Sequence, residues 1–251
     1  MSLRPSWSYV QARLQARHGE RVTEGDWRLL EAVRSPDRFI DRTRATALRR
    51  FSERLNTAMS SHAIERELRN AWRDYVAEVA SWCPPDWRPA ILWCAPLADL
   101  PLFAALLRGE APYWVQQDAA LSRFLELAQG AAIRSPLDVL LPGPKREPTL
   151  AGRWYAHWRS LWPQDARQRR GLTALAGTVK AHVAHLDLAG PQHTSVAYRH
   201  ALAQAVNRMF RRHAASPVSA LCHLALVALD LERLRGDLVR RVLFAAATEA
   251  V

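Results

Sequence analysis

Two histidines with helical spacing are the side chains in this sequence that come closest to a metal-binding pattern. His182 and His185 lie three residues apart in a segment with helical character, so they share one face. Paired imidazoles can ligate zinc, but a zinc site needs three or four ligands. The nearest further donors are His157, His193 and Asp187, and their spacing matches no known zinc motif. We therefore predict surface histidines, no metal site and no bound cofactor.

Tryptophans supply a second candidate for chemistry. Trp154, Trp158 and Trp162 recur every four residues, and such a stripe can stack on nucleic-acid bases or on a ligand. Tryptophan also dominates the energetics of cores and protein interfaces, so we favour a core or interface role. The Trp- and Pro-rich run from Trp82 to Cys94 is interpreted as a stiff corner between two helices, with a rigid recognition loop as the alternative.

Arginines supply the third candidate. Arg208, Arg211 and Arg212 lie at positions i, i+3 and i+4, so they share one helix face. Such a face can bind phosphate groups, dock on an acidic protein surface, or simply be solvated. The arginines that we predict to form a partner interface are Arg208, Arg211, Arg212, Arg233, Arg235, Arg240 and Arg241.

The motifs of several large enzyme classes are absent from the sequence. It contains no phosphate-binding P-loop, no nucleophile elbow, no zinc-protease helix and no dinucleotide-binding turn. Only 10 glycines occur among 251 residues, which leaves few for loops that cradle phosphates. We therefore expect a protein that is not catalytic by itself.

Composition and charge bound the class of protein. The chain is 49% hydrophobic and 24% charged, which is typical of a globular domain. Its net charge is +11, and residues 147–251 hold 14 basic against 7 acidic side chains, a net charge of +7. A basic C-terminal half suits an acidic protein partner, anionic lipid headgroups or nucleic acid.

Helical patterns run through nearly the whole sequence. Thr23 and Asp26 have the spacing of a capping box, and the pairs Ser35-Pro36 and Ser216-Pro217 are typical helix starts. After Ser61, apolar residues recur on one helical face up to Val79. No run of alternating β-branched residues is present, so the predicted fold class is all-α.

A pattern of amphipathic helix, proline break and more apolar helix occurs near residues 62–109 and again near 198–241. Each copy turns polar after an Asp-Leu pair, at Asp99 in the first and Asp230 in the second. A repeated helical unit of this kind is typical of scaffold proteins, and we expect two or three such bundle units.

The predicted domain boundary is the Pro- and Gly-rich segment 142–148, where a helix cannot continue. It divides an N-terminal helical part, 1–141, from a basic C-terminal unit, 149–251.

The sequence predicts a cytoplasmic protein. No stretch of about 18 uncharged apolar residues is present, which disfavours a membrane span, and the N-terminus lacks a signal-peptide pattern. The three cysteines are odd in number and lie in apolar stretches, which fits a reducing compartment better than a disulfide framework.

Three segments resemble the C/d family of coupling subunits in V-type and archaeal-type rotary ATPases. The opening SYVQARLQAR followed by WRLLEA is similar to the start of that family, with Tyr9, Ala12 and Arg13 at the matching positions. PVSALCHLALVALDLERLRGDLVRR resembles its recurring helix, and LADLPLFAALLRG resembles an earlier copy. In the later segment the matching residues are Asp230, Leu231, Leu234 and Arg235.

The resemblance implies a mechanical role. Members of that family are all-helical and have no catalytic residues, and they join the central stalk to the membrane rotor ring. It implies that Tyr9, Ala12 and Arg13 pack between helices and that the Arg-rich turn faces an acidic partner. The expected location is cytoplasmic and peripheral, on the inner face of a membrane through the partner subunits, where anionic lipid is a further possible contact. The alternatives are a basic helical nucleic-acid-binding protein, which scattered arginines and the lack of a recognition helix disfavour, and a helical adaptor of another complex.

Overall fold

The computed structural model describes residues 6–143, 149–164, 166–189 and 195–249, and within these ranges it contains helices and turns but no strand. The prediction of an all-α protein is confirmed. In chain order the elements are α1 (Trp7–Gly19), α2 (Glu24–Glu31), α3 (Pro36–Arg44), α4 (Arg49–Ser52), α5 (Ser61–Trp82), η1 (Pro85–Trp87), α6 (Arg88–Leu92), η2 (Ala95–Asp99), α7 (Leu100–Leu107), η3 (Tyr113–Gln117), α8 (Ala119–Ala128), η4 (Pro136–Leu140), α9 (Leu150–Ser160), α10 (Ala166–Ala189), α11 (Ser195–Arg212) and α12 (Pro217–Glu249).

Helix starts follow the local signals in the sequence. Thr23 and Asp26 form the predicted capping box at the start of α2, each side chain bonding the other's backbone N–H. Ser35 caps α3 ahead of Pro36, and the Ser60 hydroxyl accepts the N–H of Ala63 to cap α5. These caps satisfy backbone donors that no helical carbonyl can reach.

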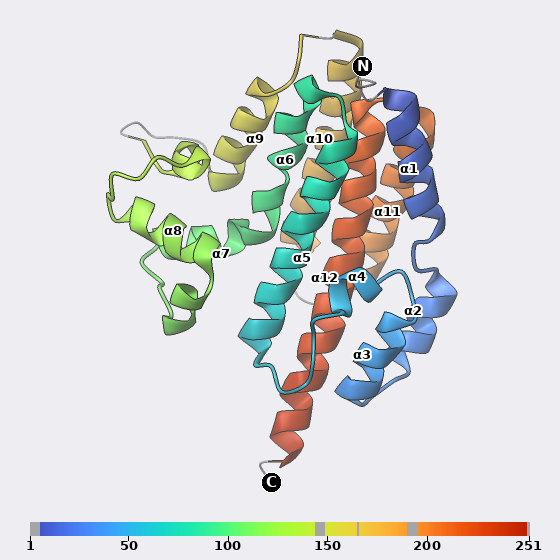
Figure 1. The fold of residues 1–251 in the computed structure, drawn as a ribbon, viewed down its shortest axis with the longest axis vertical. Helices are drawn as coiled ribbons and strands as arrows, with labels where there is room; N and C mark the ends of the chain where they lie inside the picture. Colours follow the sequence, from blue (N-terminus) through green and yellow to red (C-terminus); the bar gives the residue numbers. More distant parts are fainter. Residues whose placement is uncertain (1–5, 144–148, 165, 190–194, 250–251) are drawn as a thin grey trace, which may run out of the picture.

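Helix α12 is the centre of the molecule. It is 33 residues long, which corresponds to about 50 Å, and it begins at Pro217 as the Ser-Pro signal predicts. It contacts α1, α3, α5, α10 and α11. Figure 1 shows it in red between α5 and the pair α1 and α11, with its C-terminal end reaching beyond the other helices.

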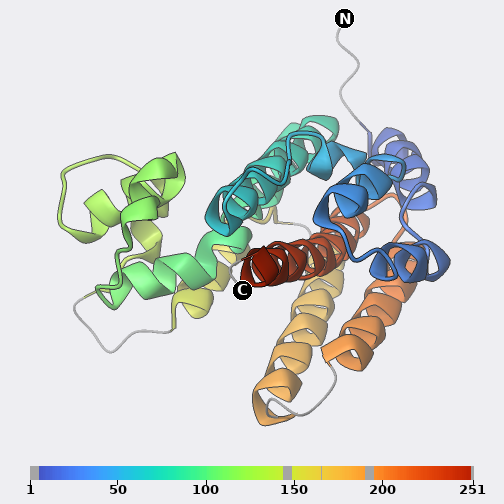
Figure 2. The same cartoon turned by 90° about the horizontal axis from the view of Figure 1, so that it is seen from below.

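The middle of the chain forms a lobe to one side. Figures 1 and 2 both place the green segment, from α7 to η4, on the side of α12 that lies away from α1, α2 and α3. Helix α9 follows this lobe in the chain and contacts α6. The indole N–H of Trp158 in α9 donates to the carbonyl oxygen of Ala90 in α6 at 3.1 Å. Trp158 and Trp162 are 4% and 5% exposed, so the predicted core role is confirmed for these two.

The Trp- and Pro-rich run from Trp82 to Cys94 is a corner, as predicted. Helix α5 ends at Trp82, and the chain turns through η1 into α6. The indoles of Trp82, Trp87 and Trp93 are all buried at this joint. Here the prolines end one helix and begin the next, while the tryptophans fill the angle between them.

The two predicted repeat units are not confirmed as bundles. The apolar part of the second copy is one unbroken helix, α12, whereas the apolar part of the first is divided among α6, η2 and α7. Pro89, Pro96 and Pro101 lie in the first copy, and each removes a backbone donor that a continuous helix needs. The two copies therefore share a sequence pattern but differ in backbone structure.

One segment of the described chain, Pro85–Leu107, is long and apolar enough by composition to cross a membrane, with a mean hydropathy of 1.9. Charged residues such as Arg88 and Asp99 interrupt the segment, so it contains no uncharged apolar run of spanning length. The segment changes direction between its short helices and holds the buried carboxyl group of Asp99 in ion pairs with arginines. This geometry differs from a single spanning helix, in which every backbone group is satisfied within the helix.

Most of the predicted linker 142–148 lies outside the described residues. One continuous cluster of buried apolar side chains runs through both predicted parts, from Val10 in α1 to Leu238 in α12. The division into 1–141 and 149–251 stays a prediction.

Candidate functional site

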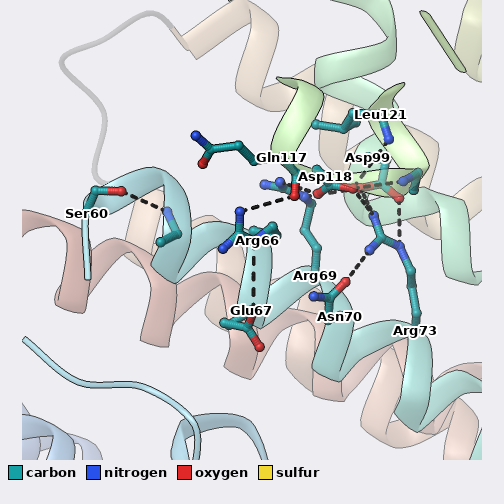
Figure 3. A network of polar contacts seen from close by, with 12 residues as sticks. Ser60, Arg66, Glu67, Arg69, Asn70, Arg73, Asp99, Gln117, Asp118 and Leu121 are labelled. Carbon is teal, nitrogen blue, oxygen red and sulfur yellow. Dashed lines mark hydrogen bonds and ion pairs between the residues drawn. The ribbon is translucent and has the colours of Figure 1, made fainter. Parts of the chain in front are cut away.

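Three buried charged groups and one half-buried arginine join α5 to the side lobe. Arg69 and Arg73 extend from α5, Asp99 ends η2, and Asp118 precedes α8 (Figure 3). Arg69 donates to Asp118 at 2.8 Å, and Arg73 donates to both oxygens of Asp99 at 2.7 and 3.2 Å. Arg69 Nε also lies 3.2 Å from an oxygen of Asp99. The four side chains form a closed network, which we name the Arg69–Asp118 network.

The charges in this network compensate one another. Burial raises the pKa of Asp99, while Arg73 and Arg69 act in the opposite direction. Asp118 is also buried, but the hydrogen bond from Arg69 and the charges of Arg73 and Arg69 together lower its pKa. Asp118 additionally caps α8 by accepting from the N–H of Ala120 and Leu121. With each group engaged by the others, this network acts as a structural joint.

The second Asp-Leu pair makes a similar bond elsewhere. Asp230 in α12 accepts two hydrogen bonds from the guanidinium group of Arg21, at 2.8 and 2.9 Å. Arg21 follows α1, so this ion pair connects the two ends of the chain across 209 positions. Both aspartates of the predicted repeat thus anchor an arginine from another element.

A cleft of about 290 Å³ opens beside this ion pair. It lies between the end of α1, the segment around α4, and the facing sides of α5 and α12. We name it the His223 cleft, because His223 lines it although the residue is 0% exposed. The residues that line it are Arg17, Glu20, Arg21, Val22, Thr46, Ala47, Leu48, Arg49, Arg50, Phe51, Glu53, Tyr75, His223, Val227 and Asp230.

A tyrosine and a histidine meet at the buried side of this cleft. The hydroxyl of Tyr75 lies 2.6 Å from Nε2 of His223. Burial raises the pKa of Tyr75 to about 12, and burial together with the charges of nearby cations lowers the pKa of His223 to about 3. Both groups are therefore neutral at pH 7. We assign the phenol as the donor, which places the imidazole proton on Nδ1.

Nδ1 of His223 is buried and has no hydrogen-bond partner among the described residues. The charges that act most strongly on this ring belong to Arg21, His18, Arg50 and Arg17, and all of them disfavour a second proton. The cleft therefore combines a histidine that has an unpaired ring nitrogen with four arginines, while Glu20, Glu53 and Asp230 add carboxylates to the same lining.

The arginines of the cleft are held in place by carboxylates and by one ring. Glu78 accepts from Arg17 at 3.3 Å and from Arg50 at 3.1 Å. The Arg50 guanidinium also lies 4.9 Å from the centre of the Tyr75 ring, within the range of a cation–π contact. A second hollow of about 220 Å³ shares Arg50 and Tyr75 with this cleft, and its charged lining is mostly acidic: Glu53, Glu67, Asp74 and Glu78.

The predicted interface arginines of α12 make contacts within the chain. Arg233 pairs with Glu24 and Glu31 of α2 and lies 4.5 Å from the ring centre of Trp27. Arg235 pairs with Glu65 and Glu232, and Arg240 pairs with Asp237.

Arg241 is buried, and its guanidinium donates to the carbonyl oxygens of Leu30, Glu31 and Val33. A side chain in this position holds α2 against α12, so Arg241 does not present its charge on the surface.

The other predicted interface arginines lie on α11. Arg208, Arg211 and Arg212 are exposed, and they form the shared face that their spacing predicts. Their role in binding a partner stays a prediction.

The N-terminal residues of the resemblance lie near the surface. Ala12 is exposed, so the expectation that it packs between helices is wrong. Tyr9 is 49% exposed and accepts a hydrogen bond from Arg13, whose guanidinium lies 4.8 Å from the ring centre of Trp82. In the later segment Leu231 and Leu234 are buried in the core.

The structure does not bring the candidate zinc ligands together in a described site. The side chains of His182, His185 and Asp187 and the whole of His193 lie outside the described residues. His157 contacts the ring of Trp93, with centres 4.4 Å apart, and burial lowers its pKa. In the part of the chain with described side chains, no group of three or more His, Cys, Asp or Glu residues is placed to hold a metal ion.

The three thiols lie in the core. Cys83, Cys94 and Cys222 are buried and not joined to one another, and burial raises the pKa of each to about 12. Neutral, enclosed thiols are poor nucleophiles.

Sequence reasoning missed the His223 cleft. Its key residues, Arg21, Arg50, Tyr75 and His223, come from four separate segments and form no local motif. The one signal was the single histidine inside the apolar run Ala220 to Leu229, because a polar side chain there must find a partner in the core.

Comparison with known proteins adds no identification: no protein-family model, no curated protein and no solved structure matches the chain.

Proposed function

We propose that this protein is a non-catalytic coupling subunit of a V-type or archaeal-type rotary ATPase, which links the central stalk to the membrane rotor ring. The proposal starts from the resemblance of the opening segment and of the segment from Pro217 to Arg241 to that family. It takes the stalk and ring subunits as the partners and the inner face of a membrane as the location.

The observation that carries the proposal is the way these two segments meet. Helix α1 packs along α12, and Arg21 and Asp230 close the contact with two hydrogen bonds. The two segments that resemble this family lie far apart in the sequence but pack against each other in the fold. A coupling subunit must pass force between partners, and contacts between distant segments resist its deformation.

The distribution of arginines favours a protein partner over nucleic acid. Arg233, Arg235, Arg240 and Arg241 are engaged by carboxylates or carbonyl groups of the chain itself. Nucleic-acid binding relies on many cations that are free to contact phosphates. The exposed face of Arg208, Arg211 and Arg212 is a compact basic surface suited to docking on an acidic protein.

The experiment that tests this proposal is a pull-down of tagged protein from its native cell in mild detergent, read by mass spectrometry. We expect rotor-ring, stalk and ATP-hydrolysing subunits to be recovered together. Recovery of nucleic acid, or of an unrelated complex without those subunits, would overturn the proposal in favour of one of its two alternatives.

Charge reversal tests the surface within the same assay. Changing Arg208, Arg211 and Arg212 to Glu should abolish recovery of the partners. Reversing Arg28, Arg38 and Arg42, which are exposed on α2 and α3, changes the net charge by the same amount and should leave recovery intact. Equal recovery with both triple variants would show that α11 is not the docking surface.

A further inference from the structure

We propose that the His223 cleft is a binding site for a small oxyanion, such as inorganic phosphate or the phosphate group of a small molecule. The arginines of its walls would hold the negative charge, and His223 would donate a hydrogen bond to one oxygen. This site is independent of the proposed coupling role.

The first argument is the unpaired donor. Tyr75 donates to Nε2 of His223, so the remaining ring proton lies on Nδ1, which is buried and has no partner among the described residues. A buried N–H without an acceptor destabilises the folded protein, and an oxyanion oxygen that reaches Nδ1 from the cleft would remove that cost. An oxyanion supplies acceptors and no obligatory donor.

The second argument is the free donors on the walls. Among the described contacts, Arg50 donates to Glu78 through Nη1 alone. Arg21 binds Asp230 and the carbonyl of Leu226 through Nε and Nη2, which leaves Nη1. A guanidinium group has five N–H donors, so each arginine can hold its carboxylate and an anion together.

The third argument is the electrostatic potential at the floor. The guanidinium groups of Arg21, Arg50 and Arg17 place positive charge near the His223 ring, while burial lowers the pKa of the neighbouring His18. Burial is the largest cause of the low pKa of His223 and disfavours charge of either sign, but the contribution of the arginines favours a negative charge beside the ring. Burial strengthens this preference, because solvent screens charges less in a partly enclosed site.

The fourth argument is size and lining. A volume of about 290 Å³ is several times what one phosphate group fills. Leu48, Phe51 and Val227 line the cleft beside the arginines. The cleft therefore has room for an apolar or aromatic portion next to the anionic group, as ligand sites commonly do.

The test is titration calorimetry of the full chain with inorganic phosphate, adenosine monophosphate and adenosine at constant ionic strength. The proposal requires saturable binding of phosphate or of the monophosphate. Tighter binding of the monophosphate would assign a phosphorylated small molecule, and equal or tighter binding of phosphate would assign the inorganic ion. Heats for adenosine as large as those for the monophosphate would overturn the proposal, as would an absence of saturation with all three probes.

Two substitutions at His223 distinguish the contributions of its two ring nitrogens to binding. His223→Gln keeps an acceptor near the Nε2 position for Tyr75 and removes the Nδ1 donor, so we expect affinity to fall about tenfold. His223→Asn keeps an amide near the Nδ1 position and loses the bond to Tyr75, so more binding should survive. Circular dichroism at the assay temperature establishes that both variants are folded. Unchanged affinity in folded His223→Gln contradicts the assignment of this donor.

Arg50 and Arg28 provide the matched test of charge. Arg50→Gln removes a wall cation and should weaken phosphate binding about tenfold, with recovery in Arg50→Lys. Arg28→Gln removes the same charge from an exposed position on α2 and should bind as the native protein does. Equal weakening in Arg50→Gln and Arg28→Gln would identify the binding as a diffuse surface effect and overturn the proposal.

Discussion

Trp93 and Trp154 exchange hydrogen bonds with each other's backbone. The indole of Trp93 donates to the carbonyl oxygen of Trp154 at 3.1 Å, and the indole of Trp154 donates to the carbonyl oxygen of Trp93 at 3.0 Å. The two residues are 61 positions apart, and the exchange fixes α9 against the turn after α6. A buried carbonyl that ends a short helix thereby obtains a partner that no backbone N–H supplies.

Replacing Trp154 with Phe should lower the free energy of unfolding by about 1–2 kcal/mol. The ring keeps most of its apolar contact, but the carbonyl of Trp93 loses its donor. Urea unfolding followed by circular dichroism measures the change. Trp114→Phe is the control, because Trp114 is also partly buried and no hydrogen bond from its indole is described. Equal losses at the two sites would assign the effect to ring size.

The Arg69–Asp118 network should be costly to break on one side. Arg69→Met leaves Asp118 buried with only the more distant Arg73 cation, at 3.7 Å, so we expect a loss of about 3–5 kcal/mol. Asp118→Asn keeps an oxygen that can cap α8. The double variant should lose less stability than the two single variants lose together, because it no longer holds an unpaired buried charge. A double-mutant cycle by urea unfolding gives the coupling, and strict additivity would rule out a direct interaction.

Two glycines of α10 should respond to alanine in opposite directions. A Cβ at Gly171 would lie 2.9 Å from Cγ2 of Val218, where α10 meets α12, so Gly171→Ala should be destabilising by about 1–3 kcal/mol. Gly177 is exposed with open space around it, so Gly177→Ala should stabilise by up to about 1 kcal/mol through helix propensity. Thermal unfolding of the two variants beside the native protein measures both shifts. A gain in stability at both positions would show that α10 moves away from α12 at little cost.

Stability should fall as the pH drops below about 6.5, and His223 should account for part of the fall. Its folded pKa of about 3 lies below the ordinary value of 6.5, so in this range the unfolded chain binds a proton that the folded protein excludes. The free energy of unfolding therefore decreases on acidification, by up to about 1.4 kcal/mol per pH unit from this group.

Folded His223→Gln should show a shallower dependence between pH 6.5 and pH 5, measured by urea unfolding at each pH. Burial raises the pKa of Asp99 and Asp230, but these carboxyl groups are the same in both proteins, so the difference isolates the histidine. Parallel pH profiles would mean that His223 is not held neutral.

The helices could be predicted because their signals are local. Capping at Thr23, the Ser-Pro start at Pro217 and the apolar face of α5 each depend on residues within a few turns, and all appear in the structure. The break of the first repeat copy into short helices was missed, although its prolines are visible in the sequence. The shared Asp-Leu pairs suggested two similar helices, and this similarity was given more weight than the prolines.

The candidate site could not be predicted because its contacts are long-range. Tyr75 and His223 are 148 positions apart, and Arg21 and Asp230 are 209 apart. The sequence identified Arg233 and Arg241 as surface cations from their charge alone. Their true partners, Glu31 and the carbonyls at the end of α2, become neighbours only after α2 packs on α12.

The central place of α12 also determines when the protein can fold. Helices α1, α3 and α5 bury apolar faces against a helix that begins at Pro217, so their core is incomplete while the ribosome makes the residues in between. At ordinary rates of synthesis this interval is on the order of ten seconds. During that time the N-terminal helices expose surfaces that chaperones bind, and folding of the native core waits for the last segment to emerge.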